Sequence, residues 1–149
     1  MSSPTTTDHK KPPVRIDPLR LLIVDDNQDE ADTLAMLLGY RGYHIDVAYT
    51  ASEALEMAAR CRAEVLLLDL GLPDMSGYEL AAQLQDQLDN PVLIATTGFA
   101  DEAYRRKAQE VGFAHHFVKP ISVARLRQVL ESVLTARRPK NSASADSPR

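Results

Sequence analysis

The strongest constraint on the fold is a short apolar run that ends in an aspartate. Residues 65–68 are Val-Leu-Leu-Leu, and Asp69 follows them directly. An apolar run of this length is typical of a strand buried on both faces, as in a parallel sheet covered by helices. Pro73 cannot continue a hydrogen-bonded ladder, so the strand ends before it. We therefore expect Asp69 at the carboxyl end of a central strand, where open α/β sheets bind ligands, although an aspartate that only caps a loop would also fit this stretch.

The rest of the chain repeats this pattern of a strand followed by a helix. Four more stretches are predicted to be strands: residues 19–24, 44–48, 92–96 and 114–118. Each strand precedes a stretch with apolar residues at helical spacing. N-cap residues for four of the helices are Asn27, Thr50, Ser76 and Ser122. Strict alternation predicts parallel strands joined by right-handed crossovers, and five strands are too few for a closed barrel. The fold class is therefore predicted to be α/β: a flavodoxin-like, doubly wound (βα)5 three-layer sandwich with a five-stranded parallel sheet.

Length and composition set the domain boundaries. The 149 residues fit one domain with some to spare. Residues 1–18 are rich in Ser, Thr, Pro and Lys and are predicted to be a flexible leader. Residues 19–136 form the predicted folded domain, and the polar residues 137–149 are predicted to be a disordered tail.

Composition also argues against several classes of function. The net charge of −4 gives no indication of a broad basic surface for nucleic acid. Cys61 is the only cysteine, which excludes an intrachain disulfide and a cysteine zinc site, and we interpret it as a small hydrophobic side chain. No apolar run approaches the ~20 residues that span a bilayer, and the first residues lack the hydrophobic core of a secretory signal. We therefore expect a cytoplasmic protein with no membrane partner.

Polar residues gather where the predicted strands end. These residues are Asp25, Asp26, Asp69, Thr97 and Lys119. Each has an ordinary interpretation as a turn or surface residue, but parallel strands bring them to one edge. Three close carboxylates repel one another unless a cation joins them, and Mg²⁺ suits carboxylate and phosphate oxygens. A lysine is a point donor for a phosphate, and the threonine adds a hydroxyl. The set predicts phosphoryl transfer in which a carboxylate attacks phosphorus.

In these motifs the sequence resembles the receiver domains of two-component response regulators, the family of the bacterial chemotaxis response regulator. The resemblance covers about residues 19–136. It is carried by LIVDDN at 22–27, LDLGLPDMSG at 68–77, TTG at 96–98 and VKP at 118–120. It implies a phosphoacceptor signalling domain that catalyses only its own phosphorylation and dephosphorylation.

The resemblance also implies a role for each site residue. Asp69 would be phosphorylated by a histidine kinase or a histidine phosphotransfer protein. Asp26 and Asp69 would bind Mg²⁺ directly, Asp25 would bind it through water, and the carbonyl of Gly71 would complete the protein ligands.

The remaining family residues would read out the phosphorylation. Thr97 would hydrogen-bond the phosphoryl group, and Lys119 would pair with it. The bond before Pro120 is usually cis in the family, a geometry that proline tolerates. Thr97 and His116 would form the switch, and residues 101–136 would form the surface for a partner or a dimer.

This chain departs from the family pattern at three positions. The switch residue is usually Tyr or Phe, whereas here it is His116. We interpret His116 as a ring that only fills the space of the usual aromatic residue, and we favour this interpretation over that of a pH-sensitive switch. A metal site made by His115 and His116 is disfavoured because adjacent strand residues face opposite sides. Gly71 and Phe99 occupy positions that influence hydrolysis of the aspartyl phosphate. Since neither side chain can orient a water, we predict slow autodephosphorylation.

Several alternatives stay open at the level of sequence. The domain could be a pseudo-receiver scaffold that is not phosphorylated. A haloacid-dehalogenase-type phosphatase needs a second acidic residue two positions after its nucleophile. This chain has Gly71 at that position, which disfavours this class of enzyme. A flavodoxin-type FMN protein needs a phosphate-binding loop where this chain has two aspartates, which repel phosphate. The chain could act alone, which we favour, or as the receiver of a hybrid histidine kinase.

Overall fold

The sheet holds five strands, all parallel, in the order β2-β1-β3-β4-β5. The structure is a computed structural model that describes residues 18–99 and 101–146, with side-chain surroundings up to Arg137. The strands are β1 (Arg20–Val24), β2 (His44–Ala48), β3 (Val65–Asp69), β4 (Val92–Thr97) and β5 (His115–Val118). The helices are α1 (Gln28–Gly39), α2 (Ala51–Cys61), α3 (Gly77–Gln87), α4 (Glu102–Val111) and α5 (Val123–Asp146). This topology confirms the predicted flavodoxin-like (βα)5 fold.

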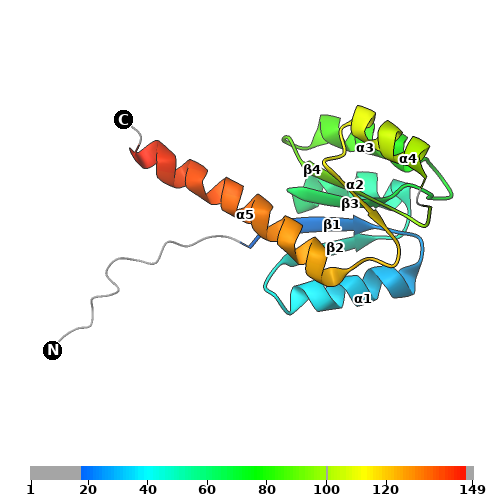
Figure 1. Ribbon diagram of the computed structural model, residues 1–149, viewed down its shortest axis with the longest axis horizontal. Coiled ribbons are helices and arrows are strands. Elements are labelled where there is room, and N and C mark those ends of the chain that lie inside the picture. Colours follow the sequence, from blue (N-terminus) through cyan, green and yellow to red (C-terminus); the bar gives the residue numbers. More distant parts are fainter. Residues whose placement is uncertain (1–17, 100, 147–149) are drawn as a thin grey trace.

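Helices cover both faces of the sheet, so the core has two layers. Figure 1 shows α1 and α5 on one side of the strands and α2, α3 and α4 on the other. Alternate residues of β3 point into opposite layers: Leu66 and Leu68 pack toward α2 and α3, whereas Val65 and Leu67 pack toward α1 and α5. Every residue of β3 is buried. Burial of each large apolar side chain contributes about 1.5–3 kcal/mol, which explains why this strand forms the centre of the fold.

The helices begin where the sequence predicts them to begin. Each predicted N-cap side chain accepts a hydrogen bond at 3.1–3.2 Å from the backbone N–H three residues further on. The four caps are Asn27, Thr50, Ser76 and Ser122. These bonds satisfy backbone donors that the first turn of a helix leaves without a partner.

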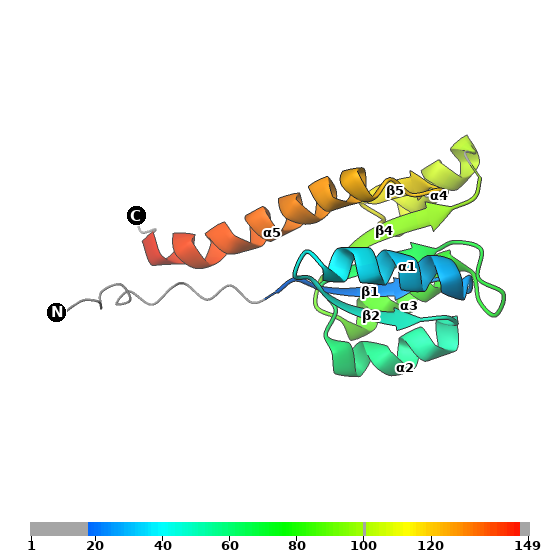
Figure 2. The same ribbon diagram turned by 90° about the horizontal axis from the view of Figure 1, so that it is seen from below.

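The last helix is longer than the sequence predicts. α5 continues to Asp146, although the folded domain was expected to end at residue 136. It projects beyond the sheet at the end where the strands begin (Figure 2). Arg137 forms an ion pair with Glu64, just before β3. Arginine and lysine are polar yet favour helix, as does alanine, so the polar composition of this segment did not mark the end of the helix.

Two predicted segments fall partly or wholly outside this description. Residues 1–17 of the predicted leader and residues 147–149 of the predicted tail lie outside the described residues. Among the helices that the structure describes, none has the length and apolar character needed to cross a membrane.

Candidate functional site

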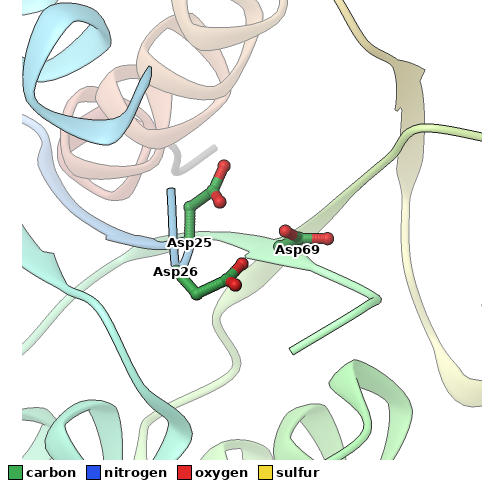
Figure 3. A group of neighbouring side chains, drawn as sticks. All are labelled: Asp25, Asp26 and Asp69. Atoms are coloured by element: carbon green, nitrogen blue, oxygen red, sulfur yellow. The ribbon is translucent and has the colours of Figure 1, made fainter. Parts of the chain in front are cut away.

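Three aspartates meet at the carboxyl edge of the sheet. Asp25 and Asp26 follow β1, and Asp69 ends β3. Because Val24 pairs with Leu68 in the parallel register, the next residue of each strand, Asp25 and Asp69, lies at the same level. Each of the three offers a carboxylate oxygen, and these oxygens lie within 4.8 Å of one another. Figure 3 shows the three side chains side by side, with Asp26 turned toward Asp69.

Burial differs among the three carboxylates. Asp25 and Asp69 are buried, each 6% exposed, whereas Asp26 is exposed. The three carboxylates repel one another when ionised, and burial of two of them adds to this effect. Their ionised form is therefore destabilised unless a positive charge lies between them. The site therefore favours a bound cation.

Lys119 supplies one positive charge from the end of β5. Its Nζ donates hydrogen bonds to Asp25 Oδ2 at 2.9 Å and to Asp69 Oδ2 at 3.2 Å. It also lies 3.1 Å from Glu30 Oε1, in the first turn of α1. An ammonium group has three N–H donors, and here three carboxylates surround it.

Lys119 and Asp69 each shift the other's pKa in the direction opposite to the shift that burial causes. Burial lowers the pKa of Lys119, but hydrogen bonds to Asp25 and the charge of Asp69 outweigh it, so the net pKa lies above its ordinary value. Burial raises the pKa of Asp69, and the N–H of Gly71 and the charge of Lys119 only partly offset this. Lys119 therefore stays charged at neutral pH, and a further cation would favour the ionised form of Asp69.

The loop after β3 is held by its own side chains. Gly71 N donates to Asp69 Oδ1 at 2.9 Å, which fixes that carboxylate. Asp74 Oδ1 accepts a hydrogen bond from Ala51 N at 3.1 Å, and its Oδ2 accepts one from Ser52 N at 3.2 Å. The loop that follows the candidate phosphoacceptor is thus tied to the N-terminus of α2.

Thr97 lies at the end of β4, beside the aspartates. It is buried, and its Oγ1 accepts a hydrogen bond from Phe99 N at 3.1 Å. Its carbonyl accepts a hydrogen bond from Lys119 N at 2.8 Å, so β4 and β5 place the threonine and the lysine together. Because Oγ1 accepts from the loop, its own hydrogen is free to donate elsewhere. The Lys119–Pro120 peptide bond is cis, the isomer that the resemblance implies.

His116 lies further from the aspartates, on β5 next to Ala95 of β4. The residue is half-buried, and both ring nitrogens are buried without a hydrogen-bond partner within the described part of the chain. Burial and the nearby charge of Arg105 lower the pKa of this imidazole. The neutral ring is therefore the favoured form in this packing.

The structure brings all the predicted site residues except His116 to one edge and adds two residues that sequence reasoning missed. Glu30 was not among the predicted site residues, yet it contacts Lys119. Asp74 was recognised only as part of a motif, yet it binds the N-terminus of α2. In each case the partner is distant in the sequence, and no local pattern marks it.

Comparison with known proteins gives a single family. A sequence profile described as "Response regulator receiver domain" matches residues 21–131. "Response regulator MprA" of Mycobacterium leprae is 28% identical over 127 residues, which cover 85% of this chain and 56% of that protein. The protein of the same name from Mycobacterium avium is 27% identical over the same shares of both chains. The chain thus spans about half the length of the curated relatives that it matches.

Solved structures give the same result. A response regulator receiver domain protein (CheY-like) from Methanospirillum hungatei JF-1 has a TM-score of 0.76 and 27% identity, covering 83% of this chain and 98% of that one. A response regulator protein from Burkholderia pseudomallei has a TM-score of 0.71 and 29% identity, covering 85% of this chain and 74% of that one. That second structure contains a phosphorylated aspartic acid, a calcium ion and citrate.

Proposed function

The chain belongs to the response regulator receiver domain family, and we propose that Asp69 is the residue on which it accepts a phosphoryl group. The observation that carries this proposal is the position of Asp69. Its carboxylate ends a fully buried strand, lies within 4.8 Å of the oxygens of Asp25 and Asp26, and accepts a hydrogen bond from Lys119. A nucleophile, a cation site and a fixed positive charge are the parts that phosphoryl transfer to a carboxylate requires.

The proposed reaction forms one bond and breaks one bond. A carboxylate oxygen of Asp69 attacks the phosphorus of a phosphohistidine on a histidine kinase or phosphotransfer protein. The new P–O bond makes an acyl phosphate, the P–N bond breaks, and the donor imidazole retains the electron pair and takes a proton from solvent. Lys119 stabilises the negative charge of the phosphoryl oxygens, and Thr97 donates its hydroxyl hydrogen to one of them.

The acidic cluster suits a divalent cation, and we propose that this cation is Mg²⁺. The donor set is made of oxygens, as hard cations prefer, and Asp26 is exposed enough to leave room for bound water. Asp26, Asp69 and the carbonyl of Gly71 would hold the cation, with Asp25 acting through water. When bound, Mg²⁺ supplies positive charge that screens the incoming phosphoryl group from the carboxylates. The calcium ion and phosphorylated aspartate of the Burkholderia protein are consistent with this assignment.

We further propose a readout surface formed by α4, β5 and the start of α5, residues 101–136. α4 buries only Ala108, and Tyr104 and Val118 are each 37% exposed. An element with so little buried surface is able to shift at low cost, so movement of Thr97 toward a phosphoryl group would change this surface through His116. The partner would be a protein or a second copy of the chain, in the cytoplasm, and not nucleic acid or membrane. The chemistry of the domain is confined to phosphorylation and dephosphorylation of Asp69.

Intact mass spectrometry tests the proposed function. The protein is incubated with acetyl phosphate, which transfers its phosphoryl group and leaves as acetate, in the presence and absence of Mg²⁺. We expect a gain of one phosphoryl group that requires Mg²⁺ and is absent from the Asp69→Asn variant. An unmodified wild-type mass with both acetyl phosphate and a phosphorylated histidine donor would refute the proposal and favour a pseudo-receiver scaffold.

A further inference from the structure

Glu30 contacts the lysine of the site but has no part in the proposed chemistry. Its Oε1 lies 3.1 Å from Lys119 Nζ, and its side chain is 51% exposed. The other two carboxylates around that nitrogen, those of Asp25 and Asp69, belong to the proposed cation site. A glutamate in this position adds a fourth negative charge to the site.

The contact uses a donor that a phosphoryl group would need. Lys119 has three N–H donors, and Asp25, Glu30 and Asp69 occupy the three positions around it. To donate to a phosphoryl oxygen, the ammonium must give up at least one of these carboxylates. Glu30 is the most exposed of the three, and it shares with Lys119 a cavity of about 390 Å³ between α1 and the start of α5. Its side chain therefore has room to move away.

The charge of Glu30 acts in opposite directions on the two ligands of the site. Glu30 and Asp69 both contact the same nitrogen, so their carboxylates lie within about 6 Å of each other. A phosphoryl group on Asp69 brings roughly −1.5 to −2 charges into this space, which the charge of Glu30 repels. A divalent cation held by Asp26 and Asp69 is attracted by the same charge.

We propose that Glu30 is a positioning residue that holds Lys119 in the unphosphorylated state, weakening the retention of a phosphoryl group and strengthening the retention of the cation. This inference rests on the proposed function, because it concerns the regulation of the same site. Glu30 thereby lowers the fraction of the protein that is phosphorylated at a given supply of phosphoryl donor.

The test compares Glu30→Gln with the wild type in two NMR titrations of the full chain. The first adds Mg²⁺ alone, and the second adds beryllofluoride, a mimic of the phosphoryl group, at saturating Mg²⁺. We expect Glu30→Gln to bind beryllofluoride roughly three- to tenfold more tightly and Mg²⁺ roughly two- to fivefold more weakly, as expected for one charge at this distance in a partly exposed site. A role in folding alone would not move the two affinities in opposite directions.

Two further variants separate the contact from charge in general. Asp29→Asn removes a charge from the same turn of α1, at an exposed residue with no ion pair to Lys119 within the described residues, and it should change each affinity less than twofold. Glu30→Asp keeps the charge and should stay within twofold of the wild type. If it behaves like Glu30→Gln, side-chain length and not charge is responsible, and the inference fails.

The outcomes distinguish this inference from the proposed function. If the wild type binds both ligands and Glu30→Gln binds them with unchanged affinities, the inference is overturned and the proposed function stands. The same holds if both affinities fall together in Glu30→Gln. A wild type that binds neither Mg²⁺ nor beryllofluoride refutes the proposed function, and the inference with it.

Discussion

Replacing Gly77 with alanine should destabilise the fold and displace the site at the same time. Gly77 is the first residue of α3, and its N–H donates to Leu70 O at 3.3 Å. A Cβ added at this position would lie 2.7 Å from the carbonyl oxygen of Asp69 and 2.7 Å from the Cα of Leu70. Both are backbone atoms, so neither can move aside by a change of rotamer.

The size of the effect follows from these distances. Ordinary contacts of a Cβ begin near 3.4 Å, so the backbone at Asp69 and Leu70 must move by about 0.7 Å or α3 must move away by as much. Overpacking of this kind costs about 1–3 kcal/mol, which lowers the unfolding temperature of a domain this size by roughly 4–12 °C. A shift approaching 1 Å at the nucleophile slows the reaction roughly 10²-fold.

Two assays measure the two effects. Thermal unfolding followed by circular dichroism gives the loss of stability, and intact mass after incubation with acetyl phosphate and Mg²⁺ gives the initial rate of phosphorylation. Gly39→Ala is the matched control, because a Cβ there meets nothing within 4 Å. Gly39 ends α1 without a positive φ, so this variant should be neutral or more stable by about 0.5–1 kcal/mol, with an unchanged rate.

Retention of wild-type stability and wild-type phosphorylation rate by Gly77→Ala would refute the reasoning. It would mean that the close approach of α3 to the loop after β3 does not position Asp69. A loss of stability without a loss of rate would show that α3 moves and the loop does not.

Three further predictions concern the cation, the histidine and the lifetime of the phosphoryl group. Mg²⁺ at ten times its Kd should stabilise the protein by about 1.4 kcal/mol in thermal unfolding, a gain that a chelator reverses and that Asp26→Asn reduces; equal stability with and without Mg²⁺ would contradict it. The pKa of His116 is lowered in the folded state, whereas in the unfolded chain the imidazole has its ordinary pKa near 6.5. Below about pH 6.5 the unfolded chain therefore binds more protons than the folded one, so stability should fall as the pH falls through about 6.5 toward the folded pKa. His116→Phe should lose this part of the slope, as measured by urea midpoints at about pH 7.5 and about pH 5.5; identical slopes in both proteins would argue against it. Phe99 is 64% exposed, and Phe99→Glu should shorten the lifetime of the phosphorylated form, followed by intact mass over time, because a carboxylate is able to orient an attacking water. A wild-type lifetime of only seconds, lengthened by this substitution, would contradict the predicted slow autodephosphorylation.

Local patterns predicted most of the fold because the physics behind them is local. The apolar run before Asp69 predicted a strand buried on both faces, and every residue of β3 is buried. The four predicted N-caps are confirmed because a capping bond joins residues only three positions apart. The end of α5 was predicted less well, because polar residues are compatible with both a helix and a disordered segment.

The sequence by itself determined which side chains stand at the ends of the strands, since each of these aspartates and the lysine comes just after a predicted strand. Only the tertiary structure decided how these side chains contact one another. The pairing of Val24 with Leu68 places Asp25 level with Asp69. The end of β5 then places Lys119 within hydrogen-bond distance of both aspartates. The contact of Lys119 with Glu30 depends on how α1 packs against β1 and α5, a matter of sheet order and helix placement. Such contacts join residues far apart in the chain, and their distances are set by the packing of the whole core, which no periodicity of a single segment records.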